Sequence, residues 1–296
     1  MKNSFFSSLF FFCILWLVTS FGQLISQKAA DSLTYYNQRI IKPIKKDDLA
    51  KAYQFFSDYK ERGHQNKEPL QTVYAIRQLA EIQRKLGYLD ESEVLNTEAL
   101  EILNTLESNE FTTQYTVGVY NHLGMIYRKR KNYEQALTFY ELAASVTNEP
   151  TQLSYIQNNI GYVYQEKKAY QQALQQFQLA YTISQESKDS IQMARSMDNL
   201  GVVESILGAP TALEKLEQAL AIRERLNYKS GIQTSLEHLS EHYALNKDTI
   251  QALAFASKAL DIAQKTNNLQ STESALALNI RLGRNTLAPA YMSVKD

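Results

Sequence analysis

Small and large apolar residues recur at helical spacing between residues 117 and 187, and the same pattern occurs there twice. The first copy contains Leu123, Gly124, Tyr127, Tyr133, Ala136, Tyr140 and Ala143; the second contains Ile160, Gly161, Tyr164, Tyr170, Ala173, Phe177 and Ala180. A fixed period of this length is typical of stacked helical repeats. Because glycine inside a helix costs roughly 1 kcal/mol against alanine, we expect Gly124 and Gly161 to permit close contact between two helices.

The same register extends over five repeats, which the spacing predicts at 73–106, 117–150, 154–187, 194–226 and 233–266. The fourth repeat is one residue shorter, with the deletion in the turn at Gly208–Pro210. There Thr211 and Glu214 form a capping-box pattern that predicts the start of a helix. On either side we expect a degenerate helical pair at 27–66, whose second helix stops at Gly63, a capping helix at 269–282 and a tail at 283–296.

The pattern resembles the tetratricopeptide repeat (TPR) family, whose motif places Leu-Gly and Tyr in one helix and small, aromatic and small residues in the next. The resemblance implies an all-α fold, a right-handed superhelical α-solenoid of twelve or thirteen helices arranged as antiparallel pairs. It also implies a non-enzymatic scaffold that binds a peptide or protein segment in a concave groove. The long repeats are similar to those of LGN-like scaffolds, kinesin light chains and bacterial extracytoplasmic sensor modules. A sensor component of a bacterial signalling system, acting through a partner, is therefore an alternative function.

Residues 1–22 have the pattern of a secretory signal peptide. Lys2 precedes an apolar run, Leu9–Val18, which is followed by Thr19, Ser20, Phe21 and Gly22. We expect cleavage after Gly22, which would make the protein secreted or periplasmic and leave no stable membrane span. Retention of the segment as an anchor is the alternative, although a spanning helix needs about 20 apolar residues.

Cleavage would remove Cys13, the only cysteine, so the mature chain would hold no disulfide and no thiolate-bound metal. Because Lys2 is the only charged residue removed, 30 basic residues would face 31 acidic ones. This charge balance does not favour nucleic acid as a partner. The sequence also contains no glycine-rich phosphate-binding motif, and we expect no cofactor.

One short string suggests metal chemistry. His238, Glu241 and His242 match the H-x-x-E-H order of zinc metalloproteases, with the two histidines on one face of a helix. The same string lies in the predicted first helix of the fifth repeat, where Leu239 and Ser240 are packing residues. A packing role without metal is therefore the main interpretation, and a zinc-dependent hydrolase is the alternative.

In the TPR family, fixed positions of each first helix face the ligand. The resemblance places them at Arg77, Arg84, Lys85, Asn121, Met125, Arg128, Tyr155, Asn158, Tyr162, Gln165, Arg195 and Asp198. Asn121 and Asn158 are equivalent, and Asn159 and Asn199 form a second such pair. Because asparagine both donates and accepts hydrogen bonds, we expect a ladder of asparagines to hold a peptide backbone without selecting its sequence. The lysine positions of the chaperone-binding carboxylate clamp do not line up in this chain.

The predicted groove separates its charges along its length. Its N-terminal half carries Arg77, Arg84, Lys85, Arg128 and Lys129, opposed by Glu81. Its C-terminal half carries Asp198, Glu237 and Glu241, opposed by Arg195. Such a gradient would orient a peptide with its acidic end toward the first and second repeats.

Overall fold

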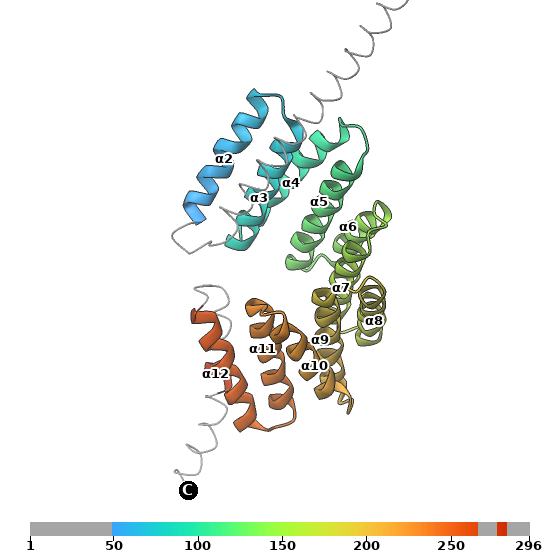
Figure 1. The fold of residues 1–296 in the computed structure, drawn as a ribbon, viewed down its shortest axis with the longest axis vertical. Coiled ribbons are helices and arrows are strands. Elements are labelled where there is room, and N and C mark those ends of the chain that lie inside the picture. Colours follow the sequence, from blue (N-terminus) through green and yellow to red (C-terminus); the bar gives the residue numbers. More distant parts are fainter. Residues whose placement is uncertain (1–48, 266–276, 283–296) are drawn as a thin grey trace, which may run out of the picture. The chain divides into compact units, whose positions relative to one another are not determined.

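The computed structural model describes residues 49–265 and 277–282. These residues form eleven long helices, α2 to α12, and a short helical segment at 277–282, and they contain no strand (Figure 1). Several predictions lie outside the described residues: the signal peptide, the first helix of the pair at 27–66, the start of the capping helix and the tail at 283–296.

The five repeats each contribute two helices. The first helices are α3 (Pro69–Leu86), α5 (Glu110–Lys129), α7 (Pro150–Glu166), α9 (Ser190–Leu207) and α11 (Lys229–Leu245). The second helices are α4 (Leu89–Asn104), α6 (Tyr133–Ser145), α8 (Tyr170–Glu186), α10 (Ala212–Arg225) and α12 (Thr249–Lys265). Helix α2 spans Leu49–Gln65, and its residues from Tyr53 onward lie in one compact unit with the later helices.

The two helices of a repeat approach closely at glycine. A Cβ atom added at Gly124 would lie 2.5 Å from Cε1 of Tyr140, and one at Gly161 would meet the ring of Phe177 in the same way. Side chains at these positions would therefore push the second helix away. The alanines of the repeating pattern are fully buried: Ala136, Ala143, Ala173 and Ala180. The predicted register of the second and third repeats is confirmed.

Each apolar core is shared by consecutive helices. One cluster joins α3, α4 and α5 through Val73, Ile76, Ala99, Leu103, Val119, Leu123 and Ile126. The next joins α5, α6 and α7 through Val117, Ala136, Tyr140, Ala143, Ile156, Ile160 and Val163. Burying one Val, Leu, Ile or Phe side chain contributes about 1.5–3 kcal/mol, so each repeat depends on its neighbours for much of its stability. The predicted all-α solenoid of stacked helix pairs is confirmed.

The first helices end in left-handed turns. After α5 the backbone N–H of Lys131 donates to the carbonyl oxygen of Arg128 at 2.8 Å, and Lys131 has a φ of 60°. Lys168 plays the same part after α7, with a φ of 60°. Gly87 and Gly208 occupy this position after α3 and α9, where the lack of a Cβ makes a positive φ easy to adopt.

The prediction that Gly63 ends a helix is wrong. Helix α2 continues to Gln65, and the left-handed residue that follows it is Lys67, with a φ of 55°. Gly63 is buried inside α2, where an added Cβ would lie 2.5 Å from Oγ1 of Thr72. This glycine therefore allows α2 and α3 to approach each other instead of terminating α2.

The capping box predicted at the start of α10 is also wrong. Thr211 is the N-cap residue, but its side chain accepts no backbone hydrogen bond. Its Oγ1 donates instead to Oε2 of Glu204 at 2.8 Å. The hydroxyl group thus ties the turn to the end of α9 instead of capping α10.

We predict that Gly161→Ala lowers the free energy of unfolding by about 1–3 kcal/mol through overpacking against Phe177, although alanine is the better helix former by roughly 1 kcal/mol. Urea denaturation provides the measurement. Phe177→Leu removes the ring that the new Cβ would meet, so the double variant should be more stable than the sum of the two single changes indicates. Additive losses would contradict the proposed contact.

Candidate functional site

The first helices of neighbouring repeats are in contact with each other: α3 with α5, α5 with α7, α7 with α9 and α9 with α11. All twelve residues predicted to face a ligand lie on these helices. We call the surface that these helices form the first-helix face. Side chains from several repeats can therefore meet on one surface.

Five predicted residues from three first helices form what we call the central cluster: Met125 and Arg128 from α5, Tyr155 and Tyr162 from α7, and Arg195 from α9. The Tyr155 hydroxyl donates to Sδ of Met125 at 3.9 Å. The guanidinium carbon of Arg195 lies 4.6 Å from the centroid of the Tyr155 ring, and that of Arg128 lies 5.2 Å from the Tyr162 ring. Each cation–π contact of this kind contributes about 0.5–2 kcal/mol, so the rings fix the orientation of both cations.

Arg128 is also bonded to the next repeat. Its Nη1 donates to Oε1 of Glu166 at 2.9 Å, and 24% of its side chain remains exposed. Within the described residues, its Nε and Oε1 of Gln165 are buried without a hydrogen-bond partner. Buried polar atoms are rarely left unbonded in folded proteins, so the cluster has hydrogen-bonding capacity that the described residues do not use.

Arg195 remains charged despite its burial. Removal from water lowers the pKa of a guanidinium group, but the phenol groups of Tyr162 and Tyr155 outweigh this effect, and the pKa of Arg195 is raised. Both rings therefore surround a permanent positive charge on the first-helix face.

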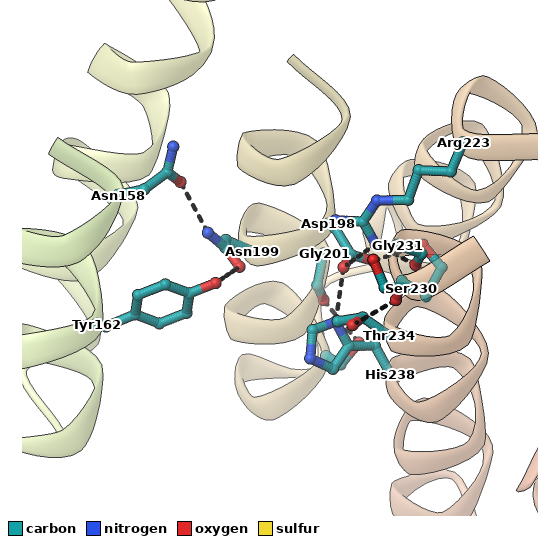
Figure 2. A network of polar contacts seen from close by, with 12 residues as sticks. Asn158, Tyr162, Asp198, Asn199, Gly201, Arg223, Ser230, Gly231, Thr234 and His238 are labelled. Atoms are coloured by element: carbon teal, nitrogen blue, oxygen red, sulfur yellow. Dashed lines mark hydrogen bonds and ion pairs between the residues drawn. The ribbon is translucent and has the colours of Figure 1, made fainter. Parts of the chain in front are cut away.

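The asparagines connect repeats to one another. Oδ1 of Asn158 accepts from Nδ2 of Asn199 at 2.7 Å, and the Tyr162 hydroxyl donates to Oδ1 of Asn199 at 2.7 Å (Figure 2). Asn121 and Asn159 form a longer bond of 3.4 Å between α5 and α7. All four asparagines are buried. Their amides are bonded within the protein, so in this structure the ladder binds neighbouring repeats together.

Asp198 has a similar role between the fourth and fifth repeats. Its Oδ2 lies 2.8 Å from Nη1 of Arg223 and 2.8 Å from Nδ1 of His238, which come from α10 and α11 (Figure 2). Nη1 of Arg223 also donates to the carbonyl oxygen of Gly231 at 3.0 Å and to Oγ of Ser235 at 2.6 Å. The Asp198 side chain is 1% exposed. A buried ion pair is favourable only when such extra hydrogen bonds complete it, so Asp198 serves here as a joint between helices.

The N-terminal part of the face contains a second group of charges. Glu81 pairs with Arg84 at 2.8 Å and with Lys85 at 3.4 Å, all on α3. His122 of α5 lies 3.9 Å from Glu81. Burial, followed by the charge of Arg77, lowers the pKa of His122 to about 4. His122 is therefore neutral at physiological pH, and Arg84 and Lys85 share the single carboxylate of Glu81 on their own helix.

Arg77 forms no ion pair with a carboxylate in the described part of the chain. Its guanidinium carbon lies 5.3 Å from the centroid of the Tyr115 ring on α5, and its Nε is buried without a hydrogen-bond partner among the described residues. A Cβ atom at Gly118 would collide with this guanidinium group. The absence of a side chain at Gly118 therefore makes room for Arg77 between α3 and α5.

The three residues of the H-x-x-E-H string each have a separate partner. These partners are Asp198 for His238, Arg281 for Glu241 and Ser205 for His242. Within residues 49–265 and 277–282, no three His, Cys, Asp or Glu side chains are grouped so that they could hold a metal ion. The string is thus used to join α11 to its neighbours.

Two important residues were missed from sequence, although signals for them exist. Arg223 lies on the buried face of α10, in line with Leu216 and Ala219, where an apolar residue is expected. A charged residue at such a position indicates a buried partner of opposite charge. Gly118 lies inside a helix but outside the Leu-Gly position of the repeat, which signals the close approach of another side chain. Neither signal identifies the partner, because Asp198 and Arg77 come from other helices.

Models of the family described as tetratricopeptide repeat match residues 116–149 and residues 152–225. The chain contains tetratricopeptide repeats. The matched ranges cover α5 to α10 and therefore include the central cluster. No curated protein is similar enough in sequence to match the chain.

Solved structures of other proteins share this TPR fold. BtubC (BKLC) from P. vanneervenii is 23% identical with a TM-score of 0.58, over 74% of this chain and 92% of that one. A Rap protein complexed with competence and sporulation factor is 14% identical with a TM-score of 0.58, over 85% and 74%. Aspartyl phosphate phosphatase F from Bacillus subtilis is 15% identical with a TM-score of 0.57, over 77% of this chain but only 61% of its own. At these identities the likeness shows the fold alone.

The Asp198 joint makes the stability of the TPR stack depend on pH. Burial lowers the pKa of His238, but Asp198 raises it by more, so the net pKa is raised. The stability that protonated His238 contributes to the fold is therefore complete below about pH 6.5 and is lost as pH rises through the raised pKa. Burial raises the pKa of Asp198, but His238 and Arg223 lower it by more, so the net pKa is lowered. The stability that ionised Asp198 contributes is therefore lost only in acid. The joint therefore stabilises most between about pH 4 and 6.5.

We predict that His238→Gln lowers the free energy of unfolding by about 1–3 kcal/mol at pH 6 and by less at pH 9. Urea denaturation at both pH values measures the difference. His64→Gln is the matched control, because the His64 side chain is 47% exposed. An equal loss at both pH values for His238→Gln would show that His238 does not carry a proton in this joint.

Proposed function

We propose that this chain is a non-enzymatic TPR scaffold that binds an extended peptide or protein segment along its first-helix face. The observation that carries the proposal is the central cluster. Predicted ligand-facing residues from α5, α7 and α9 meet there, and arginines lie over tyrosine rings. A ligand that spans three repeats would contact all of them.

The composition of the cluster suits a protein ligand. Tyrosine and arginine are enriched among the residues that contribute most to protein interfaces, because each offers a large contact area together with hydrogen-bonding groups. Arg128, Tyr155, Tyr162 and Arg195 are neither fully buried nor fully exposed. The rigid helices hold these side chains in place before binding, which reduces the entropy lost when a ligand is ordered.

The groups best suited to acid–base chemistry are committed to structure. Asp198 is bonded to Arg223 and His238 inside the protein, and His242 is bonded to Ser205. A scaffold role uses these contacts as they stand, whereas catalysis would require them to break. This supports the non-enzymatic proposal.

The comparison with known structures is consistent with the proposal. The similar Rap protein is complexed with competence and sporulation factor, so a helical array of this kind can carry a bound partner. The identity is too low for its binding residues to be transferred to this chain. The proposed site rests on the residues of the central cluster.

We further propose that the scaffold acts outside the cytoplasm, in a secreted or periplasmic location. The support is the signal-peptide pattern of residues 1–22, with cleavage after Gly22. Every helix in the described part of the chain is too short or too polar to cross a bilayer. N-terminal sequencing of the protein exported by its native host tests the cleavage site, and a retained Met1 would contradict it.

We predict that random dodecapeptides displayed on phage will yield ligands for the purified protein, and that Tyr155→Ala will weaken their binding at least tenfold, or about 1.4 kcal/mol. Fluorescence anisotropy of labelled peptides gives the dissociation constants. Tyr88→Ala is the matched control, because Tyr88 is 55% exposed and lies outside the central cluster. Peptides that bind equally well to the Tyr155→Ala protein would contradict the proposed site, and a selection that yields no ligand would contradict the function.

A further inference from the structure

Arg195 is a partly buried cation that no carboxylate among the described residues pairs with. Its guanidinium group packs on the ring of Tyr155, and Tyr162 also contributes to its surroundings. Among the residues that the structure describes, no carboxylate forms an ion pair with it. Buried charges in proteins are normally paired, so this arrangement leaves a requirement for a negative group.

The carboxylates that could neutralise Arg195, one nearby in sequence and one beside the central cluster, are already paired with other cations. Asp198 lies one turn along the same helix but is bonded to Arg223 and His238. Glu166 is bonded to Arg128. The central cluster therefore keeps one positive charge in excess, since Arg195 and Arg128 are balanced only by Glu166.

Arg77 lies three first helices away and also packs on a tyrosine ring, that of Tyr115 in the following repeat. Burial lowers the pKa of Arg77, whereas that of Arg195 is raised. Gly118 provides space for it, and its Nε is buried without a hydrogen-bond partner in the described part of the chain. Glu81, the acidic residue one turn along α3, is bonded to Arg84. Two guanidinium groups on the same face thus lack a carboxylate partner among residues 49–265 and 277–282.

The charge gradient predicted from sequence changes accordingly. Arg84, Lys85, Arg128 and Asp198 are all paired inside the protein. Among the twelve residues predicted to face a ligand, the charges left without a described ion pair are those of Arg77 and Arg195, and both are positive. Guanidinium groups bind carboxylates through two parallel hydrogen bonds, so the arrangement selects acidic side chains.

We infer that the ligand of the first-helix face is an acidic peptide segment, whose carboxylates pair with Arg195 and Arg77. The inference rests on the proposed scaffold function and adds the chemistry of its partner. Packed helices lie about 8–10 Å apart, so three steps from α3 to α9 span about 24–30 Å. An extended peptide of ten residues covers at most about 33–36 Å. A segment of ten to twelve residues can therefore reach both arginines.

A peptide is a better match than other polyanions. The chain has no net positive charge, whereas binding to nucleic acid relies on many phosphate contacts made by a basic surface. The two arginines each lie on a tyrosine ring, which gives the carboxylate side chains and apolar stems of a peptide adjacent contact surfaces.

The test uses two labelled dodecapeptides, (Glu-Ser)6 and its neutral counterpart (Gln-Ser)6, with dissociation constants measured by fluorescence anisotropy. We expect the acidic peptide to bind at least tenfold more tightly. Arg195→Gln and Arg77→Gln should each weaken it at least tenfold, and the double variant should remove the preference for acid. Arg225→Gln is the matched control, because Arg225 is exposed on the second helix α10. Circular dichroism and thermal unfolding verify that each variant is folded.

Three outcomes would overturn the inference. Equal binding of the two dodecapeptides would do so, and so would acidic binding that survives in the folded double variant. In either case, phage-selected ligands that still require Tyr155 would leave the scaffold function intact. The third outcome is a twelve-nucleotide oligothymidylate or inorganic phosphate that displaces (Glu-Ser)6 at equal concentration of charge, which would identify a general anion site.

Discussion

Hydrogen bonds between buried polar side chains of neighbouring first helices set the spacing of this stack. Apolar packing alone tolerates some sliding of one helix along another, since it is not directional. The bonds that join Asn158 to Asn199, and Asp198 to His238, do not tolerate it, because each displaced group would be left buried and unbonded. The repeats are therefore locked in one register at the same place where the apolar clusters hold them together.

This fixed register explains how a binding surface can be assembled from separate repeats. Tyr162 donates its hydroxyl hydrogen to Asn199 and also lies beneath the guanidinium group of Arg128. The same side chain thus takes part in the joint between α7 and α9 and in the central cluster. A shift of one helix would move the tyrosines away from the arginines. The structural bonds and the proposed ligand contacts consequently depend on each other.

The helix pairs could be predicted from sequence because steric constraints act locally. Only a small residue fits opposite Tyr140 or Phe177, so Gly124 and Gly161 reveal the register directly. The fate of the polar residues could not be predicted in this way. Family positions indicate which side of a helix a residue occupies, but they do not indicate whether the next repeat offers a partner. Asn158 therefore looked available to a ligand, although it is buried and bonded to neighbouring residues.

Native-state hydrogen exchange of Asn199→Ala tests most directly whether the polar bonds couple the repeats. The substitution removes one hydrogen-bond partner from each of Asn158 and Tyr162 on α7. We predict that the amides of α7 and α9 lose protection together and by the same free energy, since the two helices open as one unit. Loss of protection confined to α9, with α7 unchanged, would contradict the claim that these bonds hold the first helices together.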